Sequence, residues 1–129
     1  MKAIGWLFAM LGLLAVPAYA RDAVEDRKIE YLIGAVEQMH DATFIRNGGE
    51  YNAQQAADHM RLKLKYAGNR VRTAQDFILC CATGSSITGT PYQIKFADGR
   101  TVPSADFLRQ RLAEFSAPTT PAPDAAQSH

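Results

Sequence analysis

Hydrophobic residues that recur every three or four positions predict two long helices in the first half of the chain. The first is expected over residues 24–40 and the second over residues 52–67. The apolar positions of the first are Ile29, Leu32, Ile33, Val36 and Met39. The apolar stripe of the second consists largely of alanine. Such small side chains let another helix approach closely.

Two further helices are predicted in the second half. A short one follows Thr73, whose hydroxyl can cap its first turn, with Asp76 three residues later as an imperfect capping box. The last helix begins near Ser104, a second candidate cap. The residues expected on its buried side are Phe107, Leu108, Leu112 and Phe115.

Between these two helices the pattern becomes that of a β-hairpin. Residues 92–96 (YQIKF) alternate in strand fashion, Asp98-Gly99 is a hairpin turn signal, and residues 100–102 would form the return strand. Earlier, Asn47-Gly48-Gly49 marks a turn, because these residues tolerate left-handed backbone. The expected fold is α+β and mostly α: three helices, a short antiparallel β-hairpin and a C-terminal helix around one small core.

Both ends of the chain differ from this middle part. Lys2 precedes an apolar run over residues 3–16, and Ala18-Tyr19-Ala20 has the small-x-small pattern of a cleavage site. We therefore expect a signal peptide over residues 1–20, cleaved after Ala20, and a periplasmic or secreted protein. The run is shorter than the roughly 17–25 apolar residues of a membrane anchor, so no stable membrane insertion is expected after cleavage. Residues 21–115 would form one globular domain, and the Pro/Ala-rich residues 116–129 a disordered tail.

Charge argues against two classes of partner. The chain has 14 Lys and Arg residues, one of them Lys2, and 13 Asp and Glu residues. The exported part would thus be neutral, with alternating signs. A nucleic-acid partner normally leaves a basic footprint, and so does an anionic membrane surface, so neither is expected.

The only two cysteines, Cys80 and Cys81, are neighbours. Adjacent Cα atoms are about 3.8 Å apart, which is below the usual disulfide span of about 4.4–6.8 Å. We expect both to be small buried apolar groups. The chain has no Cys-x-x-Cys or His-x-His spacing, so neither a metal nor a cofactor is expected.

The densest run of small polar residues leads into the predicted hairpin. Residues 85–92, here called the 85–92 loop, include Ser85, Ser86, Thr88 and Tyr92. The run is explained as a helix stop, a shaped loop and a strand entry. Its length also suits recognition, and Tyr92 is an amphipathic ring typical of interfaces. The nucleophile-elbow pattern Gly-x-Ser-x-Gly is absent.

Four other residues are candidates for binding. His59 falls beside the alanine stripe of the second helix, on one shoulder with Lys63 and Tyr66. This shoulder is either a solvated face or a polar patch at the mouth of a pocket.

The other three candidates are Arg46, Glu50 and Tyr51, which flank the turn at Asn47-Gly48-Gly49. There a salt bridge or cap that fixes the turn competes with ligand binding. His40 falls on the apolar stripe of the first helix, where a hydrogen-bonded core histidine is expected.

Five blocks in order resemble a known family. They are KIEYLI (28–33), FIRNGGEY (44–51), AADHMRLKL (56–64), TAQDFI (73–78) and SSITGTPYQIKFADG (85–99). Together they resemble the YfeK-like family of small exported bacterial proteins of unknown function. The resemblance covers about residues 28–112. It implies a periplasmic or secreted single-domain protein from a Gram-negative bacterium, and it implies no activity. Thr88 and Thr90 stand where serine and a basic residue are more usual, and the paired cysteines are peculiar to this chain.

Three functions remain open at this point. The neutral charge, the lack of a nucleophile–base–orienter set and two long polar loops favour an exported binding or interaction module. Its contact surface would be the 85–92 loop with the turn over residues 46–51, and its partner an envelope protein or a small ligand. The alternative is a small periplasmic hydrolase acting on a cell-envelope substrate, with Ser86 or His59 involved. The third is an envelope protein whose loops serve only folding.

Overall fold

The computed structural model describes residues 21–85 and 87–115. The predicted signal peptide, Ser86 and the predicted tail lie outside the described residues. No helix within the described ranges is long and apolar enough to cross a membrane.

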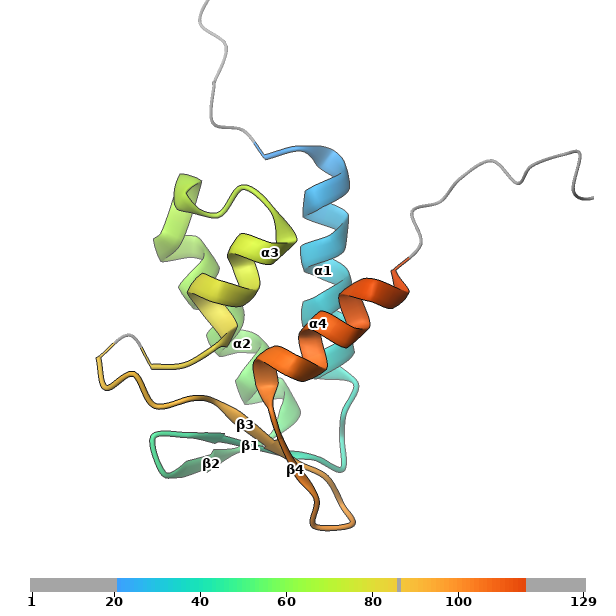
Figure 1. The fold of residues 1–129 in the computed structure, drawn as a ribbon, viewed down its shortest axis with the longest axis vertical. Coiled ribbons are helices and arrows are strands. Elements are labelled where there is room, and N and C mark those ends of the chain that lie inside the picture. The colour runs from blue at the N-terminus through green and yellow to red at the C-terminus, as the bar shows by residue number, and fades with distance from the viewer. Residues whose placement is uncertain (1–20, 86, 116–129) are drawn as a thin grey trace, which may run out of the picture.

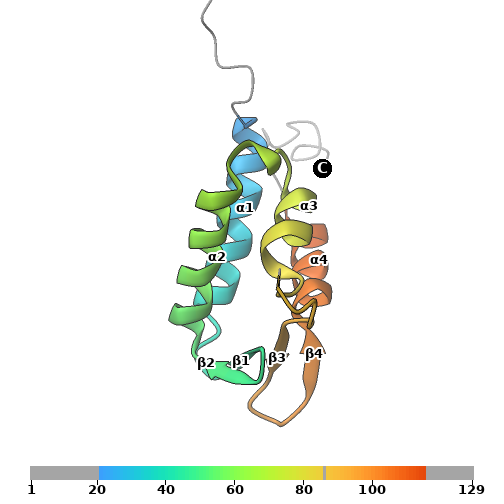
Figure 2. The same ribbon diagram turned by 90° about the vertical axis from the view of Figure 1, so that its left-hand side faces the viewer.

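The domain has a helical layer on one face of a four-stranded antiparallel sheet (Figures 1 and 2). The helices are α1 (Ala23–Glu37), α2 (Ala53–Ala67), α3 (Ala74–Phe77) and α4 (Ser104–Glu114). A 3-10 helix, η2 (Gly68–Arg70), follows α2, and a π-helix, η3 (Ile78–Ala82), continues α3. The strands are β1 (Thr43–Arg46), β2 (Gly49–Tyr51), β3 (Gln93–Lys95) and β4 (Thr101–Pro103). The predicted class, α+β and mostly α, is confirmed.

Helix α1 begins where the sequence predicts but ends earlier. The Asp22 side chain caps it by accepting a hydrogen bond from the backbone N–H of Val24. It ends at Glu37, and the chain then turns toward β1 through a hydrogen bond from the His40 N–H to the Gln38 carbonyl. His40 is therefore exposed on this turn, and its prediction as a core histidine is wrong. Apolar spacing places the face of a helix, but it does not fix the last turn.

The helix starts at Asn52 and Thr73 are set by reciprocal capping boxes. Before α2, the Asn52 side chain and the Gln55 side chain each accept from the other residue's backbone N–H. Before α3, Thr73 and Asp76 do the same, so the capping box that looked imperfect is complete. Before α4, however, Pro103 is the cap residue and forms no side-chain cap bond. Ser104 is the first helical residue and is buried, so its prediction as a cap is wrong.

The sheet contains a second hairpin that the sequence pattern did not reveal. Strands β1 and β2 pair antiparallel around Asn47 and Gly48, which have φ of 53° and 80°. Positive φ at both central residues is the turn that matches the twist of a two-residue hairpin. The expected left-handed backbone is there, but the segment is a β-hairpin and not merely a turn between helices. With strands of 4 and 3 residues, the alternation is too short to recognise.

One row of side chains crosses all four strands on the helix-facing side. Tyr51 pairs with Phe44, Phe44 with Ile94, and Ile94 with Val102. Phe44 and Ile94 are buried in the core that also holds Leu32 and Ile33 of α1. The sheet order is β2-β1-β3-β4, so β1 and β3, which are distant in sequence, form the centre of the sheet.

The two cysteines differ in burial. Cys81 is fully buried in η3, as expected, whereas Cys80 is only half-buried, and both are free thiols. Burial, and then the neighbouring Cys80, raises the pKa of the Cys81 thiol to about 12.

Candidate functional site

The 85–92 loop is held in shape by its own hydrogen bonds. The Ser85 N–H donates to the Thr90 carbonyl at 3.0 Å, and the Gly89 N–H donates to the Ser85 carbonyl at 2.9 Å. The Ser85 hydroxyl oxygen accepts from the backbone N–H groups of Ile87 and Thr88, both at 3.1 Å. Ser85 is buried, whereas the side chain of Ile87 is 93% exposed. Ser85 is thus a loop-building residue, and the loop presents an isoleucine to solvent.

The loop is attached to the β1–β2 hairpin. The Thr88 hydroxyl donates to the Asn47 side-chain oxygen at 3.0 Å, and its oxygen lies 3.0 Å from that of Thr90. Figure 1 shows the loop beside the tip of the hairpin, where Asn47 lies. The two segments that the sequence singled out separately are therefore one surface.

Beside this junction is a small hollow between α2 and the sheet. Its walls come from β1, β2, α2 and the start of β3. The lining residues are Phe44, Ile45, Arg46, Tyr51, Gln55, Ala56, His59, Met60, Tyr92, Gln93 and Ser104. The space open to water is about 30 Å³, room for roughly two water molecules when each needs about 10–15 Å³. The hollow can therefore take a group of a few heavy atoms and not a large ligand.

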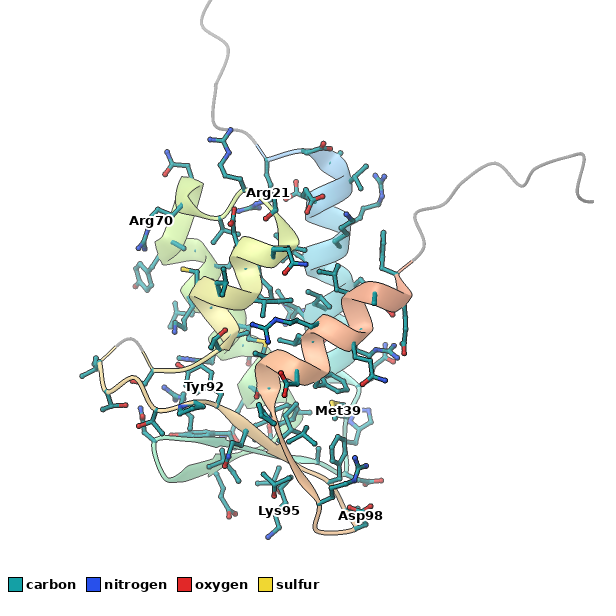
Figure 3. The ribbon with its side chains drawn as sticks, viewed as in Figure 1. Arg21, Met39, Arg70, Tyr92, Lys95 and Asp98 are labelled. Atoms are coloured by element: carbon teal, nitrogen blue, oxygen red, sulfur yellow. The ribbon has the colours of Figure 1, made fainter. Side chains whose placement is uncertain are left out.

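Tyr92, labelled in Figure 3, joins this hollow to α2. Its hydroxyl oxygen lies 3.4 Å from Nε2 of His59 and 3.2 Å from Nζ of Lys63, which also donates to the Gly84 carbonyl at 3.3 Å. Lys63 lies over the Tyr92 ring at 5.2 Å from its centroid. Of the polar shoulder expected on α2, His59 and Lys63 therefore belong to the site. Tyr66 is 75% exposed and does not.

The pKa of His59 is lowered, first by burial and then by the positive charges of Arg46 and Lys63. At neutral pH the imidazole is therefore uncharged. The unprotonated ring nitrogen of neutral His59 can accept a hydrogen bond from the Tyr92 hydroxyl, while the Tyr92 oxygen accepts a hydrogen bond from the Lys63 ammonium group. This arrangement satisfies a hydroxyl on a residue that is only 7% exposed.

The candidates near the hairpin turn separate into two faces. Arg46 lies over the ring of Tyr51 at 4.7 Å from its centroid, and both residues line the hollow. Glu50 is exposed and follows Gly49 and precedes Tyr51 in β2, so its side chain points to the opposite face of the sheet. The contact at this turn is thus cation–π stacking between Arg46 and Tyr51 in place of the expected salt bridge or cap, and Glu50 stands apart from the hollow.

The side chains gathered here offer hydrogen-bonding groups, aromatic rings and positive charge. Within residues 21–85 and 87–115, no three His, Cys, Asp or Glu side chains are grouped to hold a metal ion. The side-chain partner of His59 is the Tyr92 hydroxyl, while the Ser85 hydroxyl oxygen faces backbone N–H groups. Asn47 as a contact to the loop and Ile87 as its exposed tip were not predicted from the sequence. No sequence signal indicates the contact of Asn47, and Ile87 stands out only as an apolar residue within a polar run.

Comparison with known proteins gives a family but no activity. A protein named "Uncharacterized protein YfeK" from Salmonella typhimurium is 46% identical over 81 residues, which cover 62% of this chain and 68% of that protein. No solved structure matches the chain. The model of a family of unknown function, DUF5329, matches residues 23–116, nearly the whole described domain. The chain is therefore a member of this YfeK-like family of unknown function (DUF5329).

Proposed function

We propose that this protein is an exported binding module that contacts an envelope protein through the 85–92 loop, the β1–β2 hairpin and the hollow between them. The observation that carries the proposal is Ile87, which is 93% exposed at the tip of a loop built by hydrogen bonds. One exposed hydrophobic residue is ordinary on a protein surface. An exposed residue on a pre-organised loop is better suited to binding, because little conformational entropy is lost when a partner binds.

The bond between Thr88 and Asn47 supports the same proposal. It connects the loop to a hairpin whose own tip needs left-handed backbone at two residues. Thr88 and Asn47 thus connect the loop to the hairpin, and the hollow lined by Tyr51 and Tyr92 lies next to this junction. Tyrosine rings beside a hydrophobic anchor are typical of protein interfaces.

A photo-crosslinking amino acid in place of Ile87 tests this function in the native host. The matched control carries the same group in place of Tyr66, which is 75% exposed on α2. We expect one reproducible crosslinked protein from position 87 and not from position 66. The crosslink should weaken in Asn47→Gly, which keeps the positive φ but loses the contact to Thr88. Equal crosslinking from both positions, or no effect of Asn47→Gly, would contradict the proposal.

Catalysis by a serine is the competing function, and one reagent separates the two. A fluorophosphonate probe labels a serine that is activated by a base. Stoichiometric labelling that is lost in Ser85→Ala or Ser86→Ala would favour the hydrolase. We expect no such labelling of Ser85, because its hydroxyl oxygen accepts from two backbone N–H groups and no basic side chain contacts it among the described residues.

Export rests on the N-terminal pattern, and the mature N-terminus tests it. Cleavage after Ala20 would leave Arg21 as the first residue. The Arg21 side chain donates to the Val71 carbonyl at 2.9 Å and pairs with Asp26 at 2.8 Å, so it belongs to the folded domain. Mass spectrometry of the periplasmic fraction should give a chain that begins at Arg21.

A further inference from the structure

Two cations next to the hollow have no carboxylate partner in the part of the chain that the structure describes. Arg46 lies over the Tyr51 ring, and Lys63 contacts the Tyr92 hydroxyl and a backbone carbonyl, which are neutral acceptors. The ion pairs within residues 21–85 and 87–115 involve neither of them. Arg61, on the same helix as Lys63, instead pairs with Glu37 at 3.2 Å. Arg46 and Lys63 thus leave positive charge beside the hollow that no ion pair of the described residues compensates.

Both cations act on the same imidazole. Arg46 and Lys63 each lower the pKa of His59, after burial, and no acidic group opposes them. His59 and Arg46 are both walls of the hollow, and Lys63 shares the Tyr92 hydroxyl with His59. An anion placed here would meet two cations and a ring nitrogen that can become a donor.

The interior of the hollow is apolar. Phe44 and Met60 are buried and, with Ala56, form part of its lining between the sheet and α2. Its space of about 30 Å³ has room for a short aliphatic group, and burial of that group away from water is favourable. The site therefore combines a small apolar pocket with positive charge at its edge.

We propose that the hollow binds a carboxylate that carries a short aliphatic group, with the aliphatic group in the hollow and the carboxylate toward Arg46 and His59. This inference rests on the proposed function, because the hollow is part of the same surface, and it names the ligand chemistry. Arg favours carboxylates because its planar guanidinium can donate two parallel hydrogen bonds. Two sources share this chemistry: a free short-chain carboxylic acid and the C-terminus of a peptide.

Titration followed by ¹H–¹⁵N NMR tests this with paired probes. Isovalerate represents the free acid and N-acetylleucine the peptide end. Isovaleramide and N-acetylleucinamide have the same shape without the charge. We expect at least one acid to cause saturable chemical-shift changes at the backbone N–H groups around Tyr51 and Tyr92. The affinity for the corresponding uncharged amide ligand should be at least tenfold weaker. The better acid identifies the source.

Variants assign the contacts. Arg46→Gln should lower the affinity for the acid at least tenfold. Lys65→Gln, at an exposed position on the same helix as His59, should leave this affinity unchanged. Binding should also raise the pKa of His59, read from its ring proton, which a purely structural role of Arg46 would not cause. Amides that bind as well as acids, equal loss in Lys65→Gln, or no saturable shift up to about 50 mM ligand, weaker than the millimolar range, would overturn the inference.

The outcome is separable from that of the proposed function. If neither acid binds but the crosslink from position 87 persists and depends on Asn47, only the carboxylate inference fails. If isovalerate is the better acid and no crosslink forms, the hollow is a small-molecule site and the protein-partner proposal fails.

Discussion

The ammonium nitrogen of Lys63 lies 3.2 Å from the hydroxyl oxygen of Tyr92, and this contact connects α2 to the entry of β3. His59, one turn earlier on α2, lies 3.4 Å from the same oxygen. A hydroxyl on a residue that is 7% exposed needs partners, and the two side chains of α2 supply them. The helix and the loop therefore hold each other in position at the edge of the hollow.

Tyr92→Phe isolates the contribution of this hydroxyl. The ring stays packed, but Lys63 and His59 lose their shared partner. We expect a loss of about 1–3 kcal/mol in the free energy of unfolding, since one partner is charged. A loss of 1 kcal/mol corresponds to a Tm lower by roughly 4–8 °C in a domain of this size. The control is Tyr66→Phe, whose ring is exposed. Equal changes in Tm for both variants would show that the Tyr92 hydroxyl contributes nothing.

Stability should depend on pH through His59. Its pKa is lower in the folded protein than the ordinary value of 6.5, so the unfolded chain takes up the proton first as the pH falls. Its contribution is fully present above pH 6.5 and is lost as the pH falls below that value toward the folded pKa. The Tm should fall less between about pH 7.5 and 5 in His59→Gln than in the unmodified protein. A drop of the same size in both proteins would assign this pH dependence to other groups.

The close approach of Gly84 to the 85–92 loop can be tested with a pair of glycine substitutions. A Cβ at Gly84 would lie 2.8 Å from the Thr90 carbonyl oxygen, whereas a Cβ at Gly34 in α1 meets nothing within 4 Å. Gly84→Ala should lower the free energy of unfolding by about 1–3 kcal/mol because the backbone must shift. Gly34→Ala should raise it by roughly 0.5–1 kcal/mol through helix propensity. Chemical denaturation measures both changes. An unchanged free energy of unfolding in Gly84→Ala would mean that the loop adjusts freely.

The two thiols should react at very different rates. With a pKa of about 12, Cys81 is ionised to about one part in ten thousand at pH 8, and it is fully buried. Cys80→Ser, which leaves Cys81 alone, should resist a thiol reagent such as dithionitrobenzoate until the protein unfolds. Cys81→Ser, which leaves half-buried Cys80, should react in the folded state. Fast reaction of Cys80→Ser under native conditions would show that η3 opens readily.

Helix faces and helix starts were predictable because their signals are local. The apolar positions of α1 and the capping box at Thr73 follow from spacing and residue type alone, and Asp98-Gly99 was enough to place the β3–β4 hairpin. The end of α1 was not predictable, because the chain leaves the helix to reach β1 and this is decided by tertiary pairing. For the same reason His40 was misplaced in the core.

The candidate site was predicted in parts but not as a whole. Tyr92, His59 and Arg46 were each identifiable by residue type and position. Their convergence depends on β1 pairing with β3, which no local pattern reports. Glu50 shows the limit, since it is next to Tyr51 in sequence but points away from the hollow because side chains alternate along a strand.

The pairing of β1 with β3 also has a consequence for how the protein acquires its function. Phe44 on β1 meets Ile94 on β3, so closing the centre of the sheet requires a loop of some fifty residues to be ordered first. Contacts of such long range are formed late and slow the folding reaction. The walls of the hollow come from both sides of this pairing, so no shorter fragment of the chain contains a complete site. The proposed binding site would therefore be complete only when the sheet closes, in the same cooperative step that completes the native domain.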